Sequence, residues 1–115
     1  MVGEGIVRHP GEELEVVDCP CGKSHRFFMA SDGATMGLHK TGISGAKPHF
    51  HSEMTELYFV VEGEGQIELD GKVYDVSVGT AILIPPGVVH RGIGNFTVVV
   101  VYDKPELHGQ DTHHQ

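Results

Sequence analysis

Short apolar stretches bounded by glycine and proline run along most of this chain, and none of them extends into the periodicity of an amphipathic helix. Stretches rich in Val, Ile, Thr, Tyr and Phe between such turn residues predict β-strands. We predict strands at residues 14–18, 26–30, 35–41, 48–51, 56–62, 66–69, 73–76, 81–84, 88–92 and 97–102. Asp70-Gly71 separates two of them and is typical of a two-residue hairpin, because both positions tolerate positive φ. Many short strands at this spacing predict an all-β sandwich or small barrel.

Two of the predicted strands carry apolar side chains on both faces. They are Leu57-Tyr58-Phe59-Val60-Val61 and Val98-Val99-Val100-Val101-Tyr102. An antiparallel sheet with one face in water alternates apolar and polar residues, so a terminal segment or another subunit must cover the second face. We expect that cover to come from a homodimer.

The predicted strands fit a single domain over residues 1–104. Residues 105–115 are polar and are expected to form a mobile tail. His108, His113 and His114 in this tail are expected to be solvated.

Charge and composition narrow the range of partners. The 115 residues carry a net charge of −8 with only 8 Lys and Arg, which argues against a nucleic-acid or anionic-membrane partner. No apolar stretch reaches the ~18–20 residues of a transmembrane helix, and the N-terminus lacks the apolar segment of a signal peptide. We therefore expect a cytoplasmic protein with neither a nucleic-acid nor a membrane partner.

Two separate segments together predict a metal site. His49 and His51 point to the same side if their segment is extended, because side chains alternate along a strand. Glu56 follows at the start of an apolar strand, and His90 follows a rigid Pro-Pro-Gly turn. Three imidazoles and one carboxylate suit a divalent transition metal such as Fe, Mn, Ni, Zn, Co or Cu. Four protein ligands leave two positions open on an octahedral ion, where a substrate, water or O₂ can bind.

Glu53 is the alternative to Glu56 as the acidic ligand. On an unbroken strand Glu53 would share a face with the two histidines, but the residues around it favour a bend rather than a strand. Glu56 directly precedes the apolar run, and we prefer it for that reason.

Cys19, Cys21 and His25 form a second cluster of metal-binding residue types. One residue between the cysteines places them poorly for a mutual disulfide. The sequence offers no nearby fourth ligand, so a turn with two reduced thiols is the better interpretation than a structural zinc site.

The two histidine segments resemble the two motifs of the cupin superfamily, and in particular those of small single-domain cupins. The matching positions are His49, His51, Glu56 and Gly63 in the first motif, and Gly79, Pro85, Gly87 and His90 in the second. Two positions depart from the pattern: Ile43 stands in place of the leading glycine and Gly94 in place of the closing asparagine. Neither departure removes a metal ligand.

The resemblance implies a jelly-roll barrel, or double-stranded β-helix, with the metal held by His49, His51, Glu56 and His90 in its mouth. It also implies frequent homodimers. Cupins include dioxygenases, sugar and sugar-phosphate isomerases, lyases and plain ligand-binding domains, so the fold does not select the activity. We expect an enzyme acting on a small organic molecule, and the alternative is a non-catalytic module that binds a metal and a small ligand.

Two further residues are candidates for catalysis. Tyr58 is predicted to face inward with Glu56 and to orient a substrate or donate a proton, the alternative being a core aromatic. His39 lies in a predicted strand and is a candidate general base, although a surface position is the more common place for such a histidine.

Overall fold

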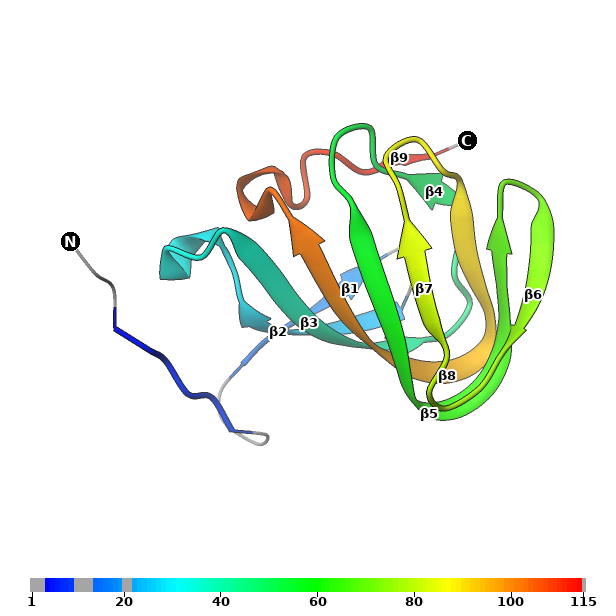
Figure 1. Ribbon diagram of the computed structural model, residues 1–115, viewed down its shortest axis with the longest axis horizontal. Helices are drawn as coiled ribbons and strands as arrows, with labels where there is room; N and C mark the ends of the chain where they lie inside the picture. The colour runs from blue at the N-terminus through cyan, green and yellow to red at the C-terminus, as the bar shows by residue number, and fades with distance from the viewer. Residues whose placement is uncertain (1–3, 10–13, 20–21, 115) are drawn as a thin grey trace.

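The computed structural model describes residues 4–9, 14–19 and 22–114 of the chain. Within these residues, nine strands form one antiparallel sheet that curls into a barrel (Figure 1). The strands are β1 (Glu15–Cys19), β2 (Gly22–Phe28), β3 (Met36–Ile43), β4 (His49–Phe50), β5 (Glu56–Leu69), β6 (Lys72–Val76), β7 (Ala81–Ile84), β8 (His90–Asp103) and β9 (His113–His114). The predicted all-β class and the jelly-roll barrel are confirmed.

Two long antiparallel strands, β5 and β8, form the central pair of the barrel. Their pairing runs from Glu56 opposite Tyr102 to Leu69 opposite His90. On one side β3 extends the sheet from β8, followed by β2 and β1. The β5 strand also pairs with β7 along its first half and with β6 along its second half.

Both long strands fold over near their midpoints, where Gly63 and Gly65 of β5 face Phe96 and Gly94 of β8. Gly63 and Gly94 have positive φ, and the register of the pairing shifts just before Gly63, between Val60 and Glu62 of β5. Figure 1 shows β5 and β8 curving together through the lower end of the barrel. Because of this bend, the two ends of the β5–β8 pair return to the same end of the molecule.

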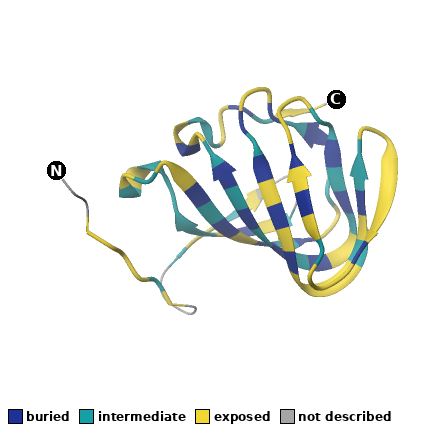
Figure 2. Cartoon of the chain, in the orientation of Figure 1, coloured by how far each residue is buried: buried dark blue, intermediate teal, exposed yellow. Residues whose placement is uncertain are grey.

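The interior is filled by side chains that alternate with exposed ones along the strands (Figure 2). Tyr58 and Val60 face inward on β5 while Leu57, Phe59 and Val61 are exposed, as the period of two predicts. The buried apolar core comprises Ile43, Met54, Tyr58, Val60, Ile67, Val76, Ile82, Ile84, Phe96, Val98, Val100 and Tyr102.

The predicted strand positions agree approximately with the structure except at the bends, at the C-terminus and at the strand predicted at 26–30. There β2 already begins at Gly22 and ends at Phe28, and Ala30 lies in a 3-10 turn. The 81–84 strand is reproduced by β7. The strands predicted at 56–62 and 66–69 are halves of β5, and those at 88–92 and 97–102 lie mostly within β8. The intervening glycines bend these strands instead of ending them, because each long strand keeps its partner through the turn.

The C-terminal residues differ from the expected mobile tail, because they pack against the barrel. They include a turn of 3-10 helix (η2, Pro105–Leu107) and strand β9, which pairs with β4. Pro105 and Asp111 are buried. The Asp111 side chain makes specific hydrogen bonds to the loop between β4 and β5, whereas His113 and His114 are exposed, as expected.

The only helices in the described part of the chain are three-residue 3-10 turns, η1 (Ala30–Asp32) and η2, so neither is long enough to cross a bilayer.

The tight bend predicts different effects for two glycine substitutions. A Cβ on Gly65 would lie 2.5 Å from the backbone oxygen of Ile93 and 2.8 Å from the Phe96 ring, whereas a Cβ on Gly42 would meet no atom within 4 Å. We expect Gly65→Ala to lower the free energy of unfolding by ~1–3 kcal/mol, the usual cost of overpacking. Gly42→Ala, the control, is expected to be neutral or slightly stabilising. Urea denaturation of both variants measures the difference, and equal effects would contradict the steric account of the bend.

Candidate metal centre

Three buried histidines from two chain segments meet at the end of the barrel opposite the bend. His49 lies on β4 and pairs with His90, the first residue of β8, while His51 follows β4 directly. One ring nitrogen from each lies within 4.8 Å of the others. The three side chains could therefore hold one metal ion.

A backbone carbonyl fixes the ring orientation of each histidine. Nδ1 of His49 lies 2.9 Å from the oxygen of Lys47, and Nδ1 of His90 lies 3.0 Å from that of Val88. Nδ1 of His51 lies 3.0 Å from the carbonyl oxygen of Asp111. A carbonyl only accepts, so each Nδ1 must donate. In the neutral rings Nε2 therefore carries the free lone pair, which is the arrangement that second-shell partners impose on metal-binding imidazoles.

Glu56, at the start of β5, lies against two of these rings. Its Oε1 lies 3.0 Å from Nε2 of His51 and 3.4 Å from Nε2 of His90. Despite this closeness, Oε1 of Glu56 and Nε2 of His90 are buried without a well-aligned hydrogen bond to any described group. Buried polar atoms are normally paired. A divalent cation among these atoms would satisfy them, so the residues fit a metal.

The electrostatics of the site keep its donors available. Burial alone would raise the pKa of Glu56, but its contacts with His51 and His90 outweigh this and lower it to about 2. Burial and the neighbouring His90 lower the pKa of His49 to about 4. His51 loses solvation too, yet its contact with Glu56 outweighs this and raises its pKa. At neutral pH Glu56 is thus an anion and His49 is a neutral imidazole.

The structure places Glu56, and not Glu53, beside the histidines. Glu53 is exposed, in the loop between β4 and β5. Cys21 lies outside the described residues, and His25 is exposed on β2.

A second polar cluster lies inside the barrel around His39 of β3. Its Nδ1 lies 3.0 Å from the Ser24 hydroxyl, and its Nε2 lies 2.7 Å from the Tyr102 hydroxyl. The His108 ring packs against both His39 and Tyr102, with centroids 4.7 and 4.9 Å away. The surface position considered for His39 is therefore wrong, because the side chain is only 3% exposed.

The groups of this cluster are uncharged at neutral pH. Burial, with a smaller effect of His108, lowers the pKa of His39 to about 3, and burial lowers that of His108 to about 4. Burial likewise raises the pKa of Tyr102 to about 12. Sequence analysis did not identify Tyr102 or His108 as functional candidates. The alternation of Val98, Val100 and Tyr102 on one face could have indicated the former, whereas nothing in the tail indicates that it folds back.

Tyr58 faces inward as predicted and lies beside the metal centre. Its ring stands edge-on to that of His90, with centroids 6.2 Å apart. Burial and the charge of Glu56 raise the pKa of its hydroxyl well above the usual value. Tyr58 is therefore a neutral group that can donate a hydrogen bond at neutral pH.

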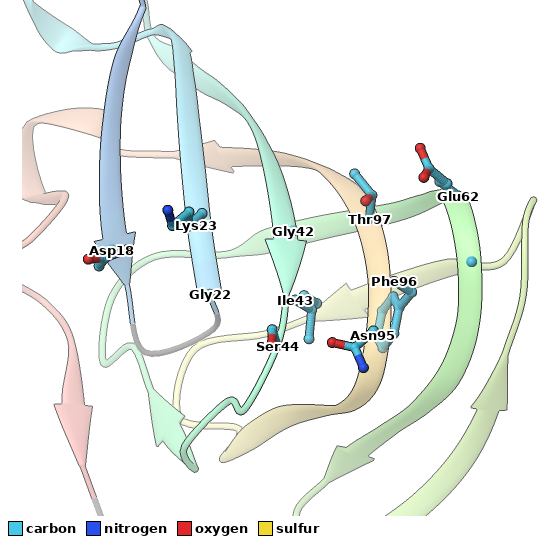
Figure 3. A pocket seen from close by; sticks show the side chains of 11 residues that line it. Asp18, Gly22, Lys23, Gly42, Ile43, Ser44, Glu62, Asn95, Phe96 and Thr97 are labelled. Carbon is cyan, nitrogen blue, oxygen red and sulfur yellow. The ribbon is translucent and has the colours of Figure 1, made fainter.

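A hollow of about 720 Å³ lies elsewhere, at the bent end of the barrel (Figure 3). Ile43 and Phe96 form part of it, and Asp18, Lys23 and Glu62 lie around it. None of the clustered histidines lines this hollow. The volume of this hollow thus points to a different place from the histidine cluster. We assign the candidate site to the histidine cluster because its donor atoms converge.

Comparison with known proteins relates this chain to one family. Residues 34–102 match the family described as cupin domain. A solved structure of a protein from Planctomyces limnophilus is 33% identical, with a TM-score of 0.85 over 95% of this chain and 96% of that one.

Two curated proteins share part of their length with this chain. A protein of unassigned function from Aquifex aeolicus is 30% identical over 67 residues, which cover 56% of this chain and 55% of that protein. Gentisate 1,2-dioxygenase of Haloferax sp is 31% identical over 83 residues, or 72% of this chain, but the match spans only 22% of the dioxygenase.

The protonation of His51 predicts how a bound metal responds to acid. Its contact with Glu56 raises its pKa above the ordinary histidine value, so the metal-free protein binds a proton there more readily than a free imidazole does, and a metal must displace that proton. We expect the Zn²⁺ affinity to fall as the pH is lowered from about 7.5 to about 5. Competition with a chelator at several pH values measures this. An affinity that stays constant down to about pH 5 would contradict a histidine-based centre.

Proposed function

The chain belongs to the cupin family, and from that premise we propose that it is a metal-dependent enzyme acting on a small organic molecule. His49, His51, Glu56 and His90 would hold a divalent transition metal. The observation that carries the proposal is the convergence of one ring nitrogen from each of three histidines near a buried carboxylate oxygen that has no well-aligned hydrogen bond to any described group. Fe, Mn, Ni, Zn, Co and Cu all suit this donor set.

The cluster around His39 favours proton transfer as the type of reaction. Tyr102 lies opposite Glu56 in the β5–β8 pairing, and both side chains are buried. The Tyr102 hydroxyl can pass its proton to Nε2 of His39 while its oxygen takes one from a substrate. His39 then holds that proton as an imidazolium whose Nδ1–H donates a hydrogen bond to the Ser24 hydroxyl, and the reverse transfer through Tyr102 returns a proton to the substrate.

We infer from these groups that the reaction is that of an isomerase or a lyase. A metal in the site would supply Lewis acidity, polarising a substrate oxygen. The Tyr102 hydroxyl would exchange the proton, His39 would act as the base behind it, and the Tyr58 hydroxyl would orient the substrate. A substrate with a carbonyl or hydroxyl group next to an acidic C–H bond matches these roles.

A dioxygenase is the second candidate function, favoured by the partial similarity to gentisate 1,2-dioxygenase. It would need a redox-active metal but no proton relay. A non-catalytic module that binds metal and ligand is the remaining alternative.

Solvent-isotope exchange and oxygen uptake distinguish these functions. The metal in the purified protein is identified by mass spectrometry. Fe, Mn, Ni and Zn forms are then incubated in D₂O with aldoses, aldose phosphates, hydroxy acids, diketones and aromatic diols. We expect deuterium to enter a substrate C–H position without O₂ consumption. O₂ consumption would favour the dioxygenase, and inactivity of every metal form would favour the binding module.

Substitution of Tyr102 tests the relay. Tyr102→Phe keeps the ring and removes the hydroxyl that contacts His39, so we expect exchange to slow by ~10²–10⁴-fold, the usual contribution of general acid–base catalysis. Metal content should be unchanged. His39→Asn should behave similarly, whereas His51→Ala should lose most of the metal. Tyr74→Phe, at an exposed tyrosine of β6, is the control. Wild-type exchange in Tyr102→Phe would exclude the relay.

We also propose that the protein is a homodimer, which uses the exposed face of β5 and β7. Leu57 lies opposite Leu83 on this face, and Phe59 is adjacent. These three side chains are 48%, 58% and 49% exposed. In a chain with a net charge of −8, an uncharged patch is where two copies can approach without repulsion.

A charge placed in this patch should separate the copies. We expect Phe59→Glu to convert the dimer to a monomer, because a buried unpaired carboxylate costs several kcal/mol. Light scattering coupled to size-exclusion chromatography gives the mass. Val73→Glu, at a half-exposed apolar position on β6, is the matched control. A wild-type monomer, or a Phe59→Glu dimer, would exclude this interface.

A further inference from the structure

The carboxylate of Asp111 binds the loop that joins two of the proposed metal ligands. Asp111 lies just before β9 and is 5% exposed. Its Oδ1 accepts the Ser52 amide at 3.0 Å, and its Oδ2 accepts the amides of Glu53 and Met54 at 2.8 and 3.0 Å. The Ser52 hydroxyl also donates to Oδ1. Three successive amides that converge on one anion form a rigid backbone nest.

The same residue also orients a histidine through its main chain. The carbonyl oxygen of Asp111 accepts the hydrogen bond from Nδ1 of His51. Without that acceptor, the neutral imidazole could carry its proton on Nε2, which would then offer no lone pair to a metal. Asp111 thus touches both His51 and the residues that lead from it toward Glu56.

Other contacts to this loop do not reach the His51 ring. Lys104 Nζ donates to the Glu53 carbonyl at 3.1 Å, and the His113 ring lies 3.3 Å from the Ser52 hydroxyl. Asp103 accepts the Thr55 amide at 2.8 Å, and the His51 carbonyl accepts the Gly87 amide at 2.6 Å. The first three loop amides, Ser52 to Met54, all donate to Asp111. The distance between His51 and Glu56 therefore depends on a residue far away in the sequence.

We propose that Asp111 is a positioning residue of the metal centre, which holds His51 and Glu56 in register for one ion and makes the C-terminal segment part of the site. This inference rests on the proposed metal binding. It assigns to residues 108–114 a role that their polar sequence does not indicate: they complete the support of a site whose donors all lie between residues 49 and 90.

Zinc titration of metal-free protein against a chromogenic chelator tests the inference. We expect Asp111→Ala to weaken Zn²⁺ binding by ~10–100-fold, the usual effect of removing a second-shell partner. Glu106→Ala removes an exposed carboxylate from the same C-terminal segment and is the control. Its affinity should be that of the wild type. A folded Asp111→Ala variant with wild-type Zn²⁺ affinity would overturn the proposal.

Two measurements on metal-free protein separate this inference from the proposed function. We expect the amides of Ser52, Glu53 and Met54 to exchange about tenfold faster in Asp111→Ala, because they lose their acceptor. At a pH high enough to keep the His51 ring neutral, its ¹⁵N shifts should show a proton on Nδ1 in the wild type and a mixed tautomer in the variant, because the side chain no longer holds the carbonyl of residue 111 beside the ring. A merely structural contribution to the C-terminal segment would leave this ring signature unchanged.

The outcomes of these measurements are distinct. If wild-type protein binds no zinc, the metal proposal fails while exchange and ring tautomer still test Asp111. If Asp111→Ala does not fold, Asp111→Asn keeps the shape of the side chain and is expected to show the same changes to a smaller extent. Unchanged exchange and an unchanged His51 tautomer in the folded variant would contradict the positioning role.

Discussion

The folding-over of β5 and β8 determines where every group of the site lies. Glu56 begins one long strand and His90 begins the other, at opposite ends of their shared ladder. In a flat sheet these two residues would be a full strand length apart. The bend at Gly63, Gly65 and Gly94 returns both ends to the same mouth, where Oε1 of Glu56 lies 3.4 Å from Nε2 of His90. The glycines at the bend thus allow Glu56 and His90 to meet at the opposite end of the barrel.

Within that mouth, hydrogen bonds outside the donor set decide what the donors can do. Each histidine donates a hydrogen bond from Nδ1–H to a backbone carbonyl, so the lone pair of the opposite nitrogen is left for a cation. Glu56 stays ionised because two imidazoles lie against it. His39 on β3 is neutral for the contrary reason, since burial lowers its pKa and outweighs the opposing charge of Glu56. The barrel interior therefore holds both an ionised carboxylate among histidines and an uncharged His39–Tyr102 pair.

Much of the site was predictable because its residues follow local rules. The i and i+2 spacing of His49 and His51 required only an extended segment, and Glu56 was favoured by the apolar strand that it begins. The inward direction of Tyr58 followed from the alternation along the same strand. By contrast, the turn-like glycines between 63 and 65 suggested the end of a strand, because a sequence shows the preference for positive φ but not the partner strand that bends with it.

By itself the sequence determined the all-β class, the inward and outward faces of the strands and the histidine pattern, because these depend on neighbours one or two positions apart. Only the tertiary structure decided the rest. It joined His39 to Tyr102, 63 residues away, and brought Asp111 back 60 residues to His51. Such contacts depend on where the barrel closes, and a polar C-terminal segment carries no local sign of the amides that it will meet. Closure of the barrel, rather than any motif, brought that segment against His51 and the loop that follows it.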